Sequence, residues 1–310
     1  MTNHNPKLQN LPREIRVIGA ASGWGAQLRA TEKGPEALHA LDCFTDLCRS
    51  GLNFEWDSLI LPRKMAENLN LPLGKPTLPY VLDHCQRLAV AVEEVIEKDH
   101  FPAVIGGDHA IAMGTWTGVT TALNAAQKFG LIWIDAHMDS HTPETSPSQA
   151  YHGMPLACLM GYGEPELVEI GSSSPKLSPQ HVVLMGIRSF ESGERALLDR
   201  LGVRIFYVEE IHERGFAVCL KEALSIVNRN TSGFGITIDL DAFDPDEAPG
   251  VGSPEGNGLR ADPVCHAFRD LVAPHPQFAA LEITEYNPQE DKDHKTGRLA
   301  CRLMRELLSQ

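Results

Sequence analysis

The sequence lacks any long apolar segment. Its 310 residues contain no apolar run close to the roughly 18 residues that a membrane-spanning helix needs. The chain also opens without the basic stretch and the apolar stretch that together make a secretory signal peptide. We therefore expect a cytoplasmic protein that does not contact a membrane.

Positive charge is also scarce. The chain has 27 Lys and Arg residues against 41 Asp and Glu residues, which gives a net charge of −14. A surface of this sign repels phosphate backbones and anionic lipid headgroups, so nucleic-acid binding and membrane binding are both disfavoured. We expect a small-molecule substrate, and bound cations would offset part of the negative charge.

Closely spaced cysteine pairs are absent. The seven cysteines are odd in number, contain no C-x-x-C pair and lie mostly inside apolar periodic segments: Cys43, Cys48, Cys85, Cys158, Cys219, Cys265 and Cys301. A disulfide framework or a cysteine-based zinc site would show even numbers or short spacings. We interpret these cysteines as reduced residues of the hydrophobic core.

What the chain does contain is a regular alternation of two kinds of segment. Eight short apolar segments are typical of strands: Arg16–Gly19, Phe54–Ile60, Phe101–Ile105, Leu131–Ile134, Val182–Ile187, Arg204–Val208, Phe234–Asp239 and Ala279–Ile283. Helices are predicted for Pro35–His39, Val81–Ile96, Ala110–Lys128, Glu194–Leu201, Phe216–Val227, Pro263–Leu271 and His294–Leu308. This alternation predicts an α/β protein with a parallel sheet wrapped by helices.

The same pattern predicts one domain. Residues 1–13 are polar and without periodicity, so we expect a flexible tail before a domain at residues 14–310. Gly171–Pro179 resembles a linker because it is rich in serine and proline. Predicted strands of one sheet lie on both sides of it, so we place no domain boundary there.

The most informative stretch is Leu131–Asp139, with the sequence LIWIDAHMD. Its apolar half is typical of a strand buried on both faces, and Asp135, His137 and Asp139 follow at the carboxyl end. Alternation places these side chains on one side, at the end of an α/β sheet where ligands bind. An isolated D-x-H-x-D sequence is more often a helix cap and a polar turn, so the motif alone decides little.

Two further strands end in similar residues. Phe101–Ile105 is followed by GGDH, which ends at His109, and Phe234–Ile238 is followed by DLD, which supplies Asp239 and Asp241. The three motifs together give six candidate metal ligands: His109, Asp135, His137, Asp139, Asp239 and Asp241. Four carboxylates and two imidazoles exceed a structural zinc site and suit two cations such as Mn²⁺. Two cations about 3.5–4 Å apart would lower the pKa of a shared water toward neutrality, so the pattern predicts a hydrolase.

These motifs resemble the arginase (ureohydrolase) family, whose blocks are GGDH, DAHxD and DxDxxDP in that order. The likeness extends from the loop after the first strand to Glu285, and the HGMP sequence at His152 resembles the HGxP segment of the arginase branch. It implies a single-domain, three-layer αβα sandwich around a mostly parallel sheet of about eight strands. It also implies a homo-oligomer, either a trimer or a hexamer.

The resemblance implies two Mn²⁺ ions per chain and a set of catalytic residues. One ion would be held by His109, Asp135, Asp139 and Asp239, and the other by Asp135, His137, Asp239 and Asp241. Asp135 and Asp239 would then bridge the two ions. Asp139, His152 as the proton shuttle and Glu285 as the guanidinium anchor match the family's catalytic positions. The implied reaction is hydrolysis of L-arginine to L-ornithine and urea by a hydroxide that bridges the two ions.

The substrate-binding positions match the family only in part. His141 stands where arginases place an asparagine that binds the substrate carboxylate, and Glu191 stands where an aspartate meets the α-amino group. Ser253 replaces a threonine, whereas Ser148 is retained. A ureohydrolase acting on agmatine, guanidinobutyrate, guanidinopropionate or formiminoglutamate is therefore the alternative.

Two other classes fit the sequence less well. A zinc deacylase on the related fold would need a pair of adjacent catalytic histidines, which the sequence lacks. A binding protein with a degenerate site would have lost a metal ligand, and all six are present.

Overall fold

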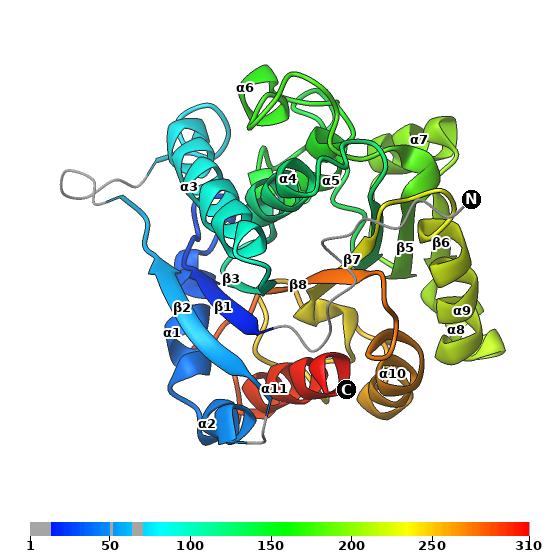
Figure 1. Ribbon diagram of the computed structural model, residues 1–310. Helices are drawn as coiled ribbons and strands as arrows, with labels where there is room; N and C mark the ends of the chain where they lie inside the picture. The colour runs from blue at the N-terminus through cyan, green and yellow to red at the C-terminus, as the bar shows by residue number, and fades with distance from the viewer. Residues whose placement is uncertain (1–13, 50–51, 64–70, 310) are drawn as a thin grey trace.

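An eight-stranded sheet forms the centre of the molecule (Figure 1). The computed structural model describes residues 14–49, 52–63 and 71–309, so the predicted tail at residues 1–13 lies outside the described part. The strands run in the order β2-β1-β3-β8-β7-β4-β5-β6, and each neighbouring pair is parallel. The predicted parallel α/β sheet is thereby confirmed.

The strands and helices alternate along the chain. The strands are β1 (Ile15–Ala20), β2 (Phe54–Ile60), β3 (Phe101–Gly106), β4 (Gly130–Ile134), β5 (Val182–Ile187), β6 (Arg204–Tyr207), β7 (Phe234–Asp239) and β8 (Phe278–Thr284). The described α-helices are α1 (Gly34–His39), α2 (Asp42–Arg49), α3 (Leu78–Glu97), α4 (Ala112–Ala122), α5 (Pro155–Leu159), α6 (Pro165–Val168), α7 (Ser192–Leu201), α8 (Val208–Arg214), α9 (Phe216–Val227), α10 (Ala261–Ala267) and α11 (Lys295–Leu308).

Helices cover both faces of the sheet, which gives three layers (Figure 1). One core packs α3, α4 and α7 against one face, and the other packs α1, α2 and α8 to α11 against the opposite face. Strand β4 serves both cores, because Ile132 and Ile134 enter one while Leu131 and Trp133 enter the other. A strand covered on both faces needs a continuous apolar run, which explains its sequence.

Several predicted boundaries are wrong. The helix expected to end at Lys128 ends at Ala122, because Asn124 and Gln127 adopt positive φ angles that a right-handed helix does not allow. The strand expected to reach Val208 ends one residue earlier, where α8 begins. The helix predicted for Pro263–Leu271 consists of α10 followed by a π-helical turn at Phe268–Val272. The short helix α2 was not predicted.

The sheet order brings the predicted motifs together. Strands β3, β8, β7 and β4 are adjacent at the centre of the sheet. The GGDH sequence follows β3, Glu285 follows β8, and the two aspartate motifs follow β7 and β4. Because the strands are parallel, all four carboxyl ends meet at one edge of the sheet, which is where α/β folds bind ligands.

Candidate active site

The imidazole of His109 lies within a buried carboxylate cluster. Its Nδ1 atom is 3.2 Å from Asp135 Oδ2, 3.1 Å from Asp139 Oδ2 and 3.2 Å from Asp239 Oδ2. Its Nε2 atom contacts Thr237 Oγ1 at 2.9 Å, which fixes the ring so that Nδ1 faces the cluster. Among the described residues, buried Nδ1 has no hydrogen-bond partner. An unpartnered imidazole nitrogen facing three carboxylate oxygens is a donor set that fits a divalent cation.

His137 belongs to a second group, which shares Asp135 with the first. Its Nδ1 atom is 3.1 Å from Asp241 Oδ2 and 3.5 Å from Asp135 Oδ1. Asp135 therefore directs one oxygen toward each histidine, as a bridging ligand would. Asp239 directs Oδ2 toward His109, while its Oδ1 accepts a hydrogen bond of 2.9 Å from the Asp241 backbone N–H. All six predicted ligands lie in two adjoining groups, and the bridging arrangement is visible for Asp135 only.

The electrostatics of this cluster favour bound cations. Burial, with repulsion from Asp241 and Asp135, raises the pKa of Asp239 well above its usual range. Burial and the Asp135 charge also raise the pKa of Asp139 to about 6. Burial would lower the pKa of His109, but the three surrounding aspartate carboxylates raise it instead. Buried carboxylates at these distances require compensating protons or cations, and the donor set suits two cations.

Three buried side chains that are not metal-ligand candidates hold His109 and Asp135 in place: Trp133, Thr237 and Glu282. The Trp133 ring stacks on His109 with centroids 4.2 Å apart, and its Nε1 donates to Asp135 Oδ2 at 2.9 Å. Thr237 donates from Oγ1 to Glu282 Oε1 at 2.7 Å, which links the His109 ring to a carboxylate inside β8. Thr237 and Glu282 were not predicted as site residues, because each lies inside an apolar strand and belongs to no motif.

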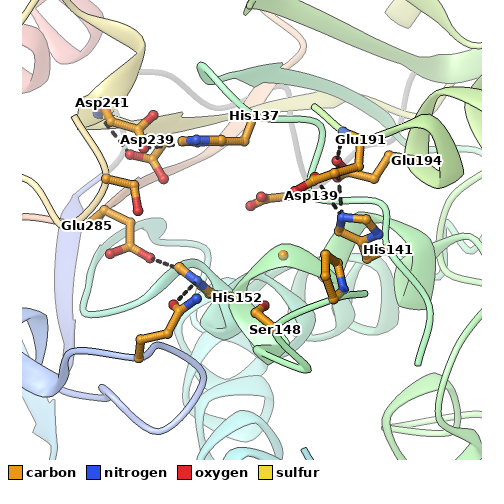
Figure 2. Close-up of a pocket in the computed structure, with 14 residues that line it drawn as sticks. His137, Asp139, His141, Ser148, His152, Glu191, Glu194, Asp239, Asp241 and Glu285 are labelled. Atoms are coloured by element: carbon orange, nitrogen blue, oxygen red, sulfur yellow. Dashed lines mark hydrogen bonds and ion pairs between the residues drawn. The ribbon is translucent and has the colours of Figure 1, made fainter. Parts of the chain in front are cut away.

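Glu285 and His152 lie beside the two ligand groups (Figure 2). Glu285 Oε1 accepts hydrogen bonds from the His109 backbone N–H at 2.9 Å and from His152 Nδ1 at 3.0 Å. The other ring nitrogen of His152 lies 3.0 Å from Gln27 Oε1, in the loop after β1. A glutamate oxygen on one side and an amide oxygen on the other suit the doubly protonated ring. Burial lowers the pKa of His152, but the hydrogen bond and charge of Glu285 outweigh it and raise the pKa to about 9.

His141, Glu191 and Glu194 form the opposite end of the site, which we call the remote end (Figure 2). His141 Nε2 is 2.9 Å from Glu191 Oε2 and 3.3 Å from Glu194 Oε2, and its Nδ1 contacts Thr145 Oγ1 at 3.1 Å. Burial raises the pKa of Glu194 to about 8. Glu194 was not predicted as a site residue, although the E-x-x-E spacing from Glu191 into the first turn of α7 is a capping-box signal that could have identified it.

A cavity of about 420 Å³ joins the two ends of the site. It is lined by Gln27, His137, Asp139, His141, Pro147, Ser148, His152, Gly153, Glu191, Glu194, Asp239, Asp241, Ser253 and Glu285. The predicted residues His109 and Asp135 do not line it, because they are buried beneath Asp139 and Asp239. The structure thus places every predicted substrate-binding residue around one cavity, with Gln27 as an additional member.

Comparison with known proteins identifies the family of this chain. The model of the Arginase family matches residues 13–309. The chain belongs to the arginase family. This arginase-family chain is 36% identical over 300 residues to a Bacillus caldovelox protein named Arginase, covering 96% of this chain and 99% of that protein. It superposes on the crystal structure of arginase from Bacillus cereus with a TM-score of 0.88 at 33% identity, covering 96% and 99% of the two chains.

A solved structure of much lower sequence identity is also similar in fold. A Trypanosoma cruzi formiminoglutamase variant matches with a TM-score of 0.72 at 19% identity, which shows a common fold. The family membership predicted from the three motifs is confirmed. Within the part of the chain that the structure describes, no helix has both the length and the apolar character to cross a membrane.

Proposed function

We propose that this arginase-family protein is a manganese-dependent hydrolase that cleaves L-arginine to L-ornithine and urea. One observation carries the proposal. A single cavity joins the cation-ligand groups, the Glu285–His152 pair and the remote end, where Glu191 can pair with a substrate ammonium group (Figure 2). The relatives named Arginase, at 30% to 36% identity over nearly the whole chain, support the same activity.

The six ligand residues would hold two Mn²⁺ ions per chain. They are His109, Asp135, His137, Asp139, Asp239 and Asp241. When bound, such ions lower the pKa of water so that hydroxide is available near neutral pH.

Glu285 is suited to hold the guanidinium group. Its Oε1 is already fixed by His109 and His152, and among the described residues no hydrogen bond to Oε2 competes with a ligand. A guanidinium is planar and permanently charged, so a carboxylate in a fixed orientation is its natural partner. Glu285 therefore places the guanidinium carbon next to the cation-ligand groups.

His152 is suited to supply the proton that the reaction needs. Addition of a water-derived oxygen to the guanidinium carbon must be followed by cleavage of the bond from that carbon to the side-chain nitrogen. That nitrogen leaves as the ornithine amine and must be protonated. His152 is protonated near neutral pH and lies beside Glu285, so it can donate this proton. Asp139, which faces the cavity, can orient the attacking water by accepting a hydrogen bond.

The remote end favours substrates that carry an ammonium group. Glu191 is the exposed carboxylate of this end, with 59% of its side chain accessible, and among the described lining residues there is no lysine or arginine. Both nitrogens of His141 already contact protein groups. Agmatine, which has an amine and no carboxylate, is therefore the second candidate, ahead of guanidinobutyrate and guanidinopropionate.

A substrate screen tests the proposal. The Mn²⁺-loaded protein should release urea from arginine with a higher kcat/KM than from agmatine, guanidinobutyrate or guanidinopropionate, and should release little formamide from formiminoglutamate. A higher kcat/KM for agmatine than for arginine would refute the arginase activity and leave only the broader ureohydrolase activity. We further propose that the protein is cytoplasmic and forms a trimer or a hexamer. Light scattering after size-exclusion chromatography would test the oligomeric state.

A further inference from the structure

Two cysteines from opposite ends of the chain meet at the interface of two helices. Cys43 lies at the start of α2 and Cys301 lies in α11, and these helices are side by side (Figure 1). Their Sγ atoms are in direct contact, 2.7 Å apart, although the residues are 258 positions apart in the sequence. We propose that Cys43 and Cys301 form a redox-active dithiol, which hydrogen peroxide closes into a disulfide between α2 and α11.

Access from solvent distinguishes the two sulfurs. Cys43 is half-buried and lines a cavity of about 210 Å³, together with Asp42, His294 and Arg298. Cys301 is 3% exposed and does not line this cavity. A small oxidant therefore reaches Cys43 first, and Cys301 is positioned behind it as the resolving thiol.

The surroundings of Cys43 favour the reactive thiolate. The contact with the Cys301 thiol lowers the pKa of Cys43 and outweighs the opposing effect of burial, while backbone N–H groups at the start of α2 and the Arg298 charge act in the same direction. Thiolates rather than thiols attack peroxides, and cationic surroundings of this kind mark reactive cysteines. Burial instead raises the pKa of Cys85 and Cys158, so these thiols should react slowly.

The reaction balances with hydrogen peroxide as the oxidant. The Cys43 thiolate attacks one peroxide oxygen, the O–O bond breaks, and the products are the Cys43 sulfenic acid and, after protonation, one water molecule. The Cys301 sulfur then attacks the Cys43 sulfur, the S–O bond breaks, and a second water leaves. Two thiols are oxidised by two electrons in total, and one peroxide is reduced to two waters.

Closure should stabilise the protein without inhibiting it. The sulfurs need to approach only from 2.7 Å to about 2.0 Å, which helices already in contact can accommodate. The start of α11 also supports the segment after Glu285, because Asp291 accepts hydrogen bonds from the Tyr286 hydroxyl at 3.0 Å and the Gly297 backbone at 3.1 Å. The disulfide would therefore stabilise the contact between α11 and the segment after Glu285 and leave Glu285 in place.

Peptide mapping of the intact Mn²⁺-loaded protein tests the linkage. Native protein is treated with hydrogen peroxide, alkylated, and digested with trypsin, which releases Cys301 in the peptide 299–302 and Cys43 in the peptide 34–49. We expect these two peptides to become linked. Peptide 34–49 also contains Cys48, so the Cys48→Ser variant is the matched control: it should keep the link, whereas Cys43→Ser should lose it. A link that persists in Cys43→Ser, or two alkylated thiols after oxidation, would overturn the proposal.

Thermal unfolding gives a second readout. Oxidation should raise the unfolding midpoint by about 5 °C or more in the unmodified protein and in Cys48→Ser, because the link closes a very long loop. Dithiothreitol should reverse the shift, and turnover should stay within about twofold. A midpoint that does not rise when the linked peptide is present, or a large loss of turnover that dithiothreitol reverses, would refute the stabilising role.

Discussion

Replacing Glu285 with glutamine removes one negative charge from the site while keeping the shape of the side chain. Glu285 is 4% exposed, and its Oε1 accepts hydrogen bonds from the His109 backbone and from His152. Glutamine can retain one acceptor but turns an N–H₂ group toward the guanidinium, where an acceptor is needed. Loss of a charge-assisted hydrogen bond costs about 1.5–3 kcal/mol, so kcat/KM for arginine should fall about 10- to 150-fold.

The same substitution should change the pH dependence. Burial lowers the pKa of His152, and the Glu285 hydrogen bond and charge raise it to about 9. In Glu285→Gln the effect of burial remains and the charge is lost, so the pKa of His152 falls. A histidine with a lower pKa loses its proton at lower pH, and the alkaline limb of the kcat profile should therefore move to lower pH.

The assay is a pH series of kcat and kcat/KM, with the metal content of each sample measured by elemental analysis. Glu290→Gln is the control, because Glu290 is exposed in the same segment after β8. Unchanged kcat/KM and an unmoved alkaline limb in Glu285→Gln would remove Glu285 from the mechanism. Loss of metal in this variant would instead give Glu285 a structural role, since its Oε1 holds the His109 backbone.

Four further predictions concern the rest of the site. Elemental analysis after Mn²⁺ loading should give two ions per chain and a raised unfolding midpoint, whereas one tightly bound zinc without activation by Mn²⁺ would contradict the binuclear site. Asp239→Ala should lose both ions and the activity; full metal content and a normal rate would show that this aspartate is not a ligand. His152→Ala should lower kcat about 100-fold at unchanged metal content, and an unaltered pH profile would exclude its role in proton transfer. His141→Asn should preserve or improve kcat/KM for arginine if the imidazole stands in for asparagine, and a loss of more than tenfold would contradict this.

The metal ligands could be predicted because their positions follow from backbone rules. The apolar segment before Asp135 is continuous because helices cover both faces of β4. Successive side chains of an extended chain point to opposite sides, so the spacing of two residues predicts which side chains share a side. Parallel strands then bring their carboxyl ends to one edge. The strand order, which places β3, β8, β7 and β4 side by side, was not predicted; the metal site was inferred from the number and kind of ligand residues at the strand ends.

The supporting residues could not be predicted in this way. Glu282 lies inside β8 and reaches His109 only through Thr237 of the neighbouring strand, a contact that depends on strand order and register. Gln27 lies in an irregular loop whose course no local pattern determines. Val208 follows the apolar residues of β6 and extends the apparent strand, although the acidic residues after it are typical of the first turn of a helix.

His141 shows how side-chain partners change a prediction made from residue identity alone. As a replacement for asparagine it was expected to donate a hydrogen bond to the substrate carboxylate. The start of α7, however, brings Glu191 and Glu194 to its Nε2, and Thr145 occupies its Nδ1. Because burial raises the pKa of Glu194 to about 8, Glu191 is the glutamate of this pair that remains ionised at neutral pH. A substrate ammonium group can pair with the Glu191 carboxylate, whereas a substrate carboxylate is repelled by it. Arginine and agmatine both satisfy Glu191 through their amines, so charge places the guanidino acids without an amine last. Arginine precedes agmatine for a different reason: the Ser148 hydroxyl lines the cavity and can donate a hydrogen bond to the arginine carboxylate, which agmatine lacks.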